Sequence, residues 1–182
     1  MTDITSAPIS DADLRRETAA GLAPRIVELI ELLFFAYRDF TAGPDKILAE
    51  FGFGRAHHRV LHFVNRYPGL RVADLLDILK ITKQSLARVL KQLVEQGYIE
   101  QRAGTSDRRE RLLFTTDKGA QLAERLMEPQ KQRIGKAIEL AGQGGADTMA
   151  RLMLALIDRG EQAAVEALIH REDSGAKGKT ET

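Results

Sequence analysis

The sequence predicts a mainly α-helical fold with one small β-hairpin. Two observations support this fold class. Apolar residues recur at helical spacing along most of the chain, and only two short β-like segments interrupt them, at Tyr98–Arg102 and Arg111–Thr115. The segment between them, Ala103–Asp107, contains the small and polar residues typical of a hairpin loop. The 182 residues suffice for one domain of ordinary size, or for a small binding unit with appended helices.

Composition limits the chemistry. Hydrophobic residues make up 43% and charged residues 29%, as in an ordinary globular protein. The chain has no cysteine, which excludes disulfides, thiolate catalysis and thiolate metal sites. Its start lacks the basic and apolar parts of a secretory signal. The most apolar stretch, Ile26–Phe40, is too short and too charged to cross a membrane. We therefore expect a cytoplasmic protein with no membrane partner.

The first long helix is predicted to begin at Pro24, because proline is tolerated in the first turn. We expect it to end at Thr41–Pro44, and residues 1–22 to be a flexible extension with a short helix at Asp11–Ala20. Apolar residues nearly encircle the helix at 24–42: Ile26, Val27, Ile30, Leu33, Phe34, Tyr37 and Phe40. Such a helix must be covered on more than one side, which favours a second subunit.

Three shorter helices are predicted next, at Arg55–Arg66, Arg71–Leu79 and Thr82–Gln96. The last two are separated by a tight turn, and Thr82 is a good N-cap for the helix that it precedes. Gly97 is expected to end that helix. Their apolar stripes comprise Val60, Leu61 and Val64, then Val72, Leu75, Leu76 and Leu79, then Leu86, Val89, Leu90, Leu93 and Val94.

Two further helices are predicted after the hairpin. Thr116 can cap a helix at Asp117–Leu140, and a break at Gly142–Gly145 separates it from a last helix at Ala146–Ile169. Residues 170–182 are predicted to be a disordered tail. One apolar seam runs along the last helix: Met149, Leu152, Met153, Leu156, Ala163, Ala164, Ala167 and Leu168. A seam of this kind favours contact with another helix.

Two short helices joined by a tight turn and followed by a basic hairpin make a helix-turn-helix with a wing. The whole chain has a formal net charge of only +1, but the segment Lys80–Arg111 contains eight basic and four acidic residues. Local clustering of this kind is the electrostatic footprint of a nucleic-acid binder. With the apolar stripe turned inward, the helix at Thr82–Gln96 points three side chains outward, Gln84, Arg88 and Lys91, with Ser85 on the flank.

These residue types suit a DNA duplex. Gln and Arg make bidentate contacts with base edges in the major groove, and Lys suits phosphates. In the hairpin, Arg108, Arg109 and Arg111 accompany Asp107. An arginine at the tip can enter a minor groove, and a pair between Asp107 and Arg109 would hold one guanidinium forward. The alternatives are a solvated helix face and a charged turn that keeps the loop soluble.

The run from Pro68 to Gly119 resembles the MarR family of bacterial transcription regulators. Its most specific part is DRR followed by LLFTTDKG, with Asp107 twelve residues before Gly119. The segments Glu31–Asp45 and Gly52–Val64 resemble the PetP-type branch of that family. The resemblance implies a winged helix-turn-helix domain at 23–169. Within it, it implies dimerisation helices at about 24–42 and 117–169 and a DNA-binding lobe at about 53–116.

The resemblance also implies the DNA-binding residues: Thr82, Lys83, Gln84, Ser85, Arg88 and Lys91 in the helix, and Asp107, Arg108 and Arg109 in the wing. The chain departs from the family at two positions. Arg71 stands where members often have Ser or Thr, and Lys80 stands where they often have Gly. Lys80 would then need a left-handed conformation. Both changes add positive charge, which favours phosphate contacts.

The family commonly binds small ligands in a cleft beside the dimerisation helices. Here the residues implied to line that cleft are Phe34, Tyr37, Arg38, His58 and His62. Arg38 would favour an anionic ligand such as an aromatic carboxylate. The pair His58 and His62 leaves a metal ion, haem or proton sensing as options, and a closed core without an effector is the alternative. No third metal ligand is evident from spacing, so no cofactor or metal is expected. His57 falls on the apolar stripe and is expected to be half-buried and hydrogen-bonded.

Catalytic motifs are missing from the sequence, which contains no GxGxxG, GxxxxGK[ST], HExxH or GxSxG. We therefore expect no enzyme. The expected function is sequence-specific binding of double-stranded DNA by a homodimer on a pseudo-palindromic operator, as a repressor that a small molecule releases. The alternative is a winged-helix module that binds protein or RNA and no operator.

Overall fold

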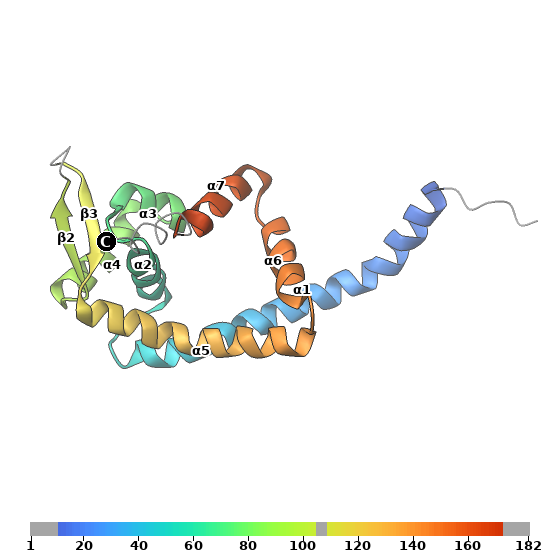
Figure 1. The fold of residues 1–182 in the computed structure, drawn as a ribbon, viewed down its shortest axis with the longest axis horizontal. Coiled ribbons are helices and arrows are strands. Elements are labelled where there is room, and N and C mark those ends of the chain that lie inside the picture. The colour runs from blue at the N-terminus through green and yellow to red at the C-terminus, as the bar shows by residue number, and fades with distance from the viewer. Residues whose placement is uncertain (1–10, 105–108, 173–182) are drawn as a thin grey trace, which may run out of the picture. The chain divides into compact units, whose positions relative to one another are not determined.

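The computed structural model describes residues 11–104 and 109–172. The chain divides into two compact units, residues 1–131 and 132–182. Figure 1 labels the helices α1 to α7 and the strands β2 and β3. The predicted fold class, mainly α-helical with a small antiparallel sheet, is confirmed.

The first helix is longer at both ends than the sequence predicts. α1 spans Asp11–Ala49 without a break, so the separate short helix expected at Asp11–Ala20 is part of it. The expected end at Thr41–Pro44 is wrong, because α1 continues through this segment. Residues 1–10 of the predicted flexible extension lie outside the described residues.

Packing against α5 (Asp117–Ala141) explains why α1 continues through Pro44. Proline cannot donate a backbone hydrogen bond and usually ends a helix. Here Pro44 is fully buried. A Cβ on neighbouring Gly43 would lie only 2.9 Å from the Cβ of Pro129, so the missing side chain lets the two helices approach closely. Burial of this contact offsets the lost hydrogen bond.

Three helices contribute many of the buried apolar side chains of the first unit. They are α2 (Arg55–Arg66), α3 (Val72–Leu79) and α4 (Lys83–Glu95). Most of the apolar stripes predicted for them are confirmed as core, since these side chains are buried: Val60, Leu61, Val64, Leu75, Leu79, Leu86, Val89, Leu90 and Leu93. The sequence therefore predicted the inward face of α4 correctly, which also fixes its outward face.

The sheet has three antiparallel strands in the order β1-β3-β2. The hairpin of β2 (Ile99–Ala103) and β3 (Arg111–Thr115) matches the two predicted segments to within a residue. The third strand, β1 (Leu70–Arg71), was not predicted. It pairs Leu70 with Leu113 and Arg71 with Leu112 on β3. Arg71, expected at the start of a helix, therefore belongs to the sheet and precedes α3.

Helix α5 is tied to the base of the hairpin. The Thr116 hydroxyl accepts a hydrogen bond from Gly119 N at 3.1 Å, so the predicted cap is confirmed. Thr116 N donates to Tyr98 O at 3.1 Å, and the Lys118 ammonium lies 4.1 Å from the centroid of the Tyr98 ring. These contacts hold α5 against the residue that precedes β2.

The second unit contains two helices where the sequence predicts one. α6 spans Gly145–Ala155 and α7 spans Arg159–Ile169, so the expectation of a single helix at Ala146–Ile169 is wrong. The break falls at Asp158, whose backbone is extended with ψ of 133°. The Gln162 side chain donates to Ile157 O at 2.8 Å and satisfies a carbonyl that the broken helix leaves free.

The expected disordered tail is only partly described. His170–Glu172 form a short 3₁₀ turn, and residues 173–182 lie outside the described residues. No helix in the described ranges is both long and apolar enough to cross a membrane.

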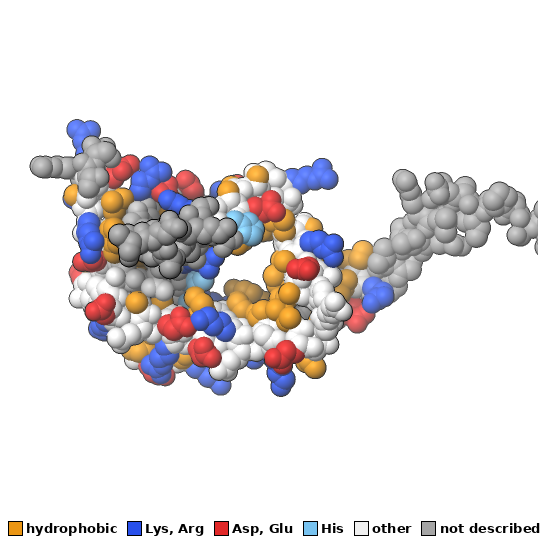
Figure 2. Space-filling model, viewed as in Figure 1, with side chains coloured by type: hydrophobic (Ala, Val, Ile, Leu, Met, Phe, Trp, Pro, Cys, Tyr) orange, Lys and Arg blue, Asp and Glu red, His pale blue; other side chains and the backbone are white. Residues whose placement is uncertain are grey.

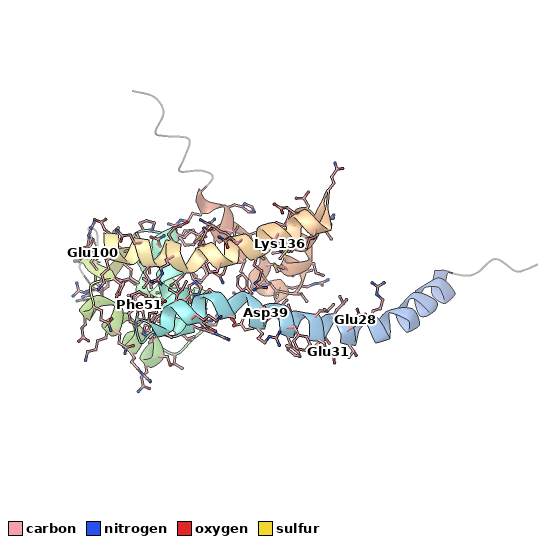
Figure 3. All side chains as sticks on the ribbon, turned by 90° about the horizontal axis from the view of Figure 1, so that it is seen from below. Glu28, Glu31, Asp39, Phe51, Glu100 and Lys136 are labelled. Carbon is pink, nitrogen blue, oxygen red and sulfur yellow. The ribbon has the colours of Figure 1, made fainter. Side chains whose placement is uncertain are left out.

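Large apolar side chains remain exposed in both units. On α1 they are Ile26, Val27, Leu29, Ile30, Leu32, Leu33, Phe34, Phe35 and Tyr37. Figure 3 shows this helix running past Glu28, Glu31 and Asp39 toward Phe51. In the second unit, α6 and α7 have no buried side chain among the described residues, and Figure 2 shows hydrophobic side chains on the surface of α6. Apolar surface of this extent is rare on a monomer.

Candidate nucleic-acid interface

The turn between α3 and α4 fixes the start of α4, the helix whose outward side chains are predicted to contact DNA. Lys80 adopts the left-handed conformation that we expected, with φ of 49° and ψ of 43°, and its N–H donates to Leu76 O at 2.9 Å. Thr82 is the N-cap, as predicted. Its hydroxyl oxygen accepts a hydrogen bond from Ser85 N at 3.1 Å. The first turn of α4 is therefore rigidly held.

The outward face of α4 has the residues that the sequence places there. Gln84, Arg88 and Lys91 are all exposed, opposite the buried apolar stripe. The Lys91 ammonium lies 3.8 Å from a Glu95 oxygen, but both side chains are largely exposed. Exposed ion pairs of this kind contribute little to the stability of the fold. The face therefore offers an amide, a guanidinium and an ammonium to a ligand.

His57 supports α4 from behind. Gly54 N donates to His57 Nδ1 at 3.1 Å, so the ring proton belongs on Nε2, which lies 2.6 Å from Gln92 Oε1 and donates to it. The ring also stacks on Phe53, with 4.6 Å between centroids. The expected hydrogen bonding of His57 is confirmed, and the side chain is buried where a half-buried one was expected. His57 links the start of α2 to α4 and is not free to bind a metal.

A backbone hydrogen bond joins the two strands of the wing at its neck, the point where the chain leaves the paired part of the hairpin. Gly104 N donates to Glu110 O at 3.1 Å just beyond the paired strands. Arg102 pairs with Glu100 and places its guanidinium 4.3 Å from the centroid of the Phe114 ring. Arg109 and Arg111 are exposed. Figure 2 shows Lys and Arg side chains around this part of the molecule.

Two predicted wing residues, Asp107 and Arg108, lie outside the described residues. The structure therefore neither supports nor contradicts the expected pair between Asp107 and Arg109. Of the three wing residues that the sequence selects, only Arg109 is placed.

Arg71 has a different environment from the phosphate contact that the sequence suggested. Its Nε and Nη2 donate to the two carboxylate oxygens of Asp74 at 2.8 and 2.6 Å. Its Nη1 donates to Glu110 at 3.2 Å. The hydrogen bonds that Arg71 donates to Asp74 and Glu110 raise the pKa of Arg71 further above its already high value. Sequence reasoning missed this contact because Glu110 is distant in the chain.

A hollow of about 500 Å³ lies on the flank of α4, and no pattern in the sequence signals it. Val72 and Leu76 of α3 and Ala87 of α4 contribute apolar walls, and Lys83 and Lys91 also line it. Lys83 and Lys91, both predicted to contact DNA, therefore lie beside this hollow.

The predicted effector residues on α1 are exposed and have separate neighbours. Phe34 is 67% and Tyr37 55% exposed. The Arg38 guanidinium pairs with Asp39 at 2.8 Å and lies 5.0 Å from the centroid of the Phe35 ring. Tyr37 instead has Arg55 5.5 Å from its ring centroid. The α1 side chains therefore do not form one enclosed pocket within the described chain.

His58 and His62 occupy one face of α2 and are half-buried. Burial lowers the pKa of both imidazoles. The charge of His62 lowers that of His58 further, and the charge of Arg66 does the same for His62. Across residues 11–104 and 109–172, no group of three or more His, Cys, Asp or Glu side chains is placed to hold a metal ion. The two histidines therefore form only a pair.

Comparison with known proteins gives a consistent result. Residues 51–110 match the model of the MarR family. The chain is 48% identical over 129 residues to the HTH-type transcriptional regulator PetP of Rhodobacter capsulatus. The matched segment covers 71% of this chain and 78% of that protein.

Solved structures show the same fold at low sequence identity. The transcriptional regulator SlyA aligns with a TM-score of 0.58 and 18% identity, over 79% of this chain and 96% of that one. The reduced form of MarR from E. coli aligns with a TM-score of 0.56 and 20% identity, over 71% and 96%.

Proposed function

The chain belongs to the MarR family of transcription regulators, and on that premise we propose that it is a homodimeric repressor that binds a specific sequence of double-stranded DNA. One observation carries this proposal. The capped helix α4 points Gln84, Arg88 and Lys91 outward, beside a wing with exposed arginines. A helix of this size fits the major groove, and a thin basic hairpin fits the adjacent minor groove.

The roles of the side chains follow from their chemistry. Gln84 and Arg88 read base edges, because amides and guanidiniums can make two hydrogen bonds to one base. Lys91, Thr82 and Ser85 contact phosphates, with the start of α4 turned toward the backbone of the duplex. In the wing, Arg108 and Arg109 enter the minor groove, with Asp107 holding one of them forward.

The proposed dimer rests on the uncovered apolar surfaces. The exposed side chains of α1 between Ile26 and Tyr37 would be shielded from water by a second copy, and so would Leu152, Met153 and Leu156 in the second unit. A two-fold dimer presents two copies of α4. Its site is therefore a pseudo-palindrome with half-sites about one helical turn, or roughly 10 base pairs, apart.

Repression and its release are the finer parts of the proposal. A dimer that occupies two neighbouring grooves excludes other proteins from the same DNA. We place the effector beside α1 and α2, on the surface that contains Phe34, Tyr37, Arg38, His58 and His62. Aromatic rings with a few polar groups suit an aromatic carboxylate. A ligand that prefers a dimer with mis-spaced recognition helices shifts the population away from DNA.

The effector is tested on the protein–DNA complex. Salicylate, haem and Zn²⁺ are titrated separately, and release of DNA is followed by fluorescence anisotropy. If salicylate releases DNA from the unmodified protein but not from the Arg38→Ala variant, the proposed site is supported. If none of the three releases DNA, and Arg38→Ala and His58→Ala repress and derepress normally in cells, the effector site is elsewhere.

The DNA proposal is tested by selecting bound fragments from genomic DNA and then changing α4. Arg88→Ala is expected to cost about 1–3 kcal/mol and to relax preference at one position of each half-site. Lys91→Ala is expected to weaken all duplexes alike and to flatten the slope of log K against log salt by about one unit.

Lys136→Ala is the control, because it removes an exposed positive charge that has no role in the proposed DNA contacts. This variant should leave the affinity for the selected duplex and the slope of log K against log salt unchanged. Unchanged specific binding by Arg88→Ala would refute the assignment of the helix face. Tighter binding to RNA of the selected sequence than to the duplex would favour an RNA-binding module.

A further inference from the structure

Arg71 joins three elements of the DNA-binding lobe. It belongs to β1, its carboxylate partner Asp74 is in the first turn of α3, and its other partner Glu110 directly precedes β3. The bond to Asp74 is bidentate, with both distances below 3 Å, and the contact with Glu110 uses the remaining arm of the guanidinium. One planar group therefore spans the helix-turn-helix and the wing.

Glu110 lies at the neck of the wing. Its carbonyl accepts the hydrogen bond from Gly104 N that closes the hairpin, directly beyond the last strand pair, Ala103 with Arg111. β1 contributes only two residues to the sheet, so its ladder gives the wing little support at this end. The contact between Arg71 and Glu110 adds a second attachment there, on the side of α3.

We propose that Arg71 is a positioning residue that sets the angle of the wing relative to helices α3 and α4, and that it acts through Asp74 and Glu110 and not through a DNA phosphate. The proposal rests on the proposed function, because the angle matters only if wing and α4 engage one duplex together. A fixed angle lowers the ordering cost of binding. The fork shape of arginine is essential, since a lysine ammonium cannot bridge two carboxylates with the same geometry.

For the Glu110→Gln variant, electrostatics alone and the proposal predict opposite changes in DNA affinity, which makes the proposal testable. Removing the negative charge of Glu110 from a DNA-binding surface should strengthen binding if charge is all that matters. If Glu110 holds the wing through Arg71, Glu110→Gln should weaken binding. Asp77→Asn is the matched control, because Asp77 is an exposed acid on the same helix as Asp74 but outside the cluster. It should bind as tightly as the unmodified protein, or more tightly.

The experiment measures affinity of the full-length protein for the selected duplex at several salt concentrations. Arg71→Gln and Glu110→Gln are each expected to weaken binding by about three- to tenfold, and the double variant no more than either single one. Arg71→Lys should not restore binding, and the salt slope should stay the same. A slope flatter by about one unit, with full rescue by lysine, would instead identify Arg71 as a phosphate contact and overturn the proposal.

A measurement without DNA separates failure of this proposal from failure of the proposed function. The chain has no cysteine, so Asp77→Cys and Ala103→Cys introduce two unique sites for spin labels. Labelled protein is diluted with unlabelled chain, so that each dimer contains one labelled copy. Arg71→Gln should broaden the distance distribution between the labels. An unchanged distribution overturns the proposal whether or not the protein binds DNA, and absence of DNA binding by the unmodified protein overturns only the proposed function.

Discussion

Gly119 is predicted to be indispensable to the junction between the wing and α5. A Cβ built on this residue would lie 1.9 Å from Tyr98 O and 2.9 Å from Tyr98 C. Atoms at these distances overlap, so Gly119→Ala forces the start of α5 away from Tyr98 by about 1 Å. The backbone carbonyl cannot rotate aside, because it accepts the hydrogen bond from Thr116 N.

The cost follows from the contacts that such a shift disturbs. Overpacking at a closely packed site costs about 1–3 kcal/mol. Weakening of the hydrogen bond between Thr116 and Tyr98 adds about 1 kcal/mol. The contact between Lys118 and the Tyr98 ring weakens as well. We therefore expect Gly119→Ala to lower the free energy of unfolding by about 2–4 kcal/mol.

Urea denaturation followed by circular dichroism measures this change, at one fixed protein concentration because the stability of the proposed dimer depends on concentration. Gly135→Ala is the control. Gly135 is an exposed residue of the same helix, and a Cβ added there would have nothing within 4 Å. Alanine there should raise stability by up to about 1 kcal/mol, since it favours the helix. Equal stability of Gly119→Ala and the unmodified protein would refute the reasoning.

Two further predictions concern stability. Lys80→Gly should raise the free energy of unfolding by about 0.5–1 kcal/mol, because glycine adopts the left-handed conformation without the steric cost that lysine meets, and a loss of stability in urea would contradict this. The lowered pKa values of His58 and His62 mean that the unfolded chain binds protons more readily, so stability should fall as the pH drops below about 6.5. Combining His58→Gln with His62→Gln should flatten the dependence of the unfolding midpoint on pH between about 7 and 5, and an unchanged dependence would assign it to other groups.

Local signals in the sequence predicted the helix-turn-helix elements and the hairpin well. Thr82 caps α4 because its side-chain oxygen accepts a hydrogen bond from the backbone N–H of Ser85. The two residues are only three positions apart, so the cap depends on no distant part of the chain. The apolar stripe from Leu86 to Leu93 fixes which side of the helix faces the core. Lys80 adopts its unusual backbone because two helices meet across so short a turn.

The errors arise where tertiary contacts override local preference. Pro44 should end α1, but its burial and the approach of Pro129 to Gly43 maintain the helix. The break at Asp158 is hidden because apolar residues keep helical spacing on both sides of it. Such contacts join segments that are far apart in the chain, and periodicity does not report them.

In the candidate site, too, the features set by local sequence were predicted and those set by tertiary contacts were not. The outward placement of Gln84 and Arg88 follows from the period of one helix, and the structure agrees with it. The contact between Arg71 and Glu110 depends on how β1 pairs with β3, and a two-residue strand is too short to give a periodic signal. The five predicted effector residues belong to two helices, and their mutual placement likewise depends on packing.

The central claim is that two copies of α4 read one pseudo-palindromic site. Sedimentation of the full-length protein with a duplex selected from genomic DNA tests it most directly. We predict two chains per duplex at micromolar concentration, and loss of the complex when the spacing between half-sites is changed by about five base pairs, half a helical turn. One chain per duplex, or binding that is indifferent to spacing and sequence, would contradict the claim.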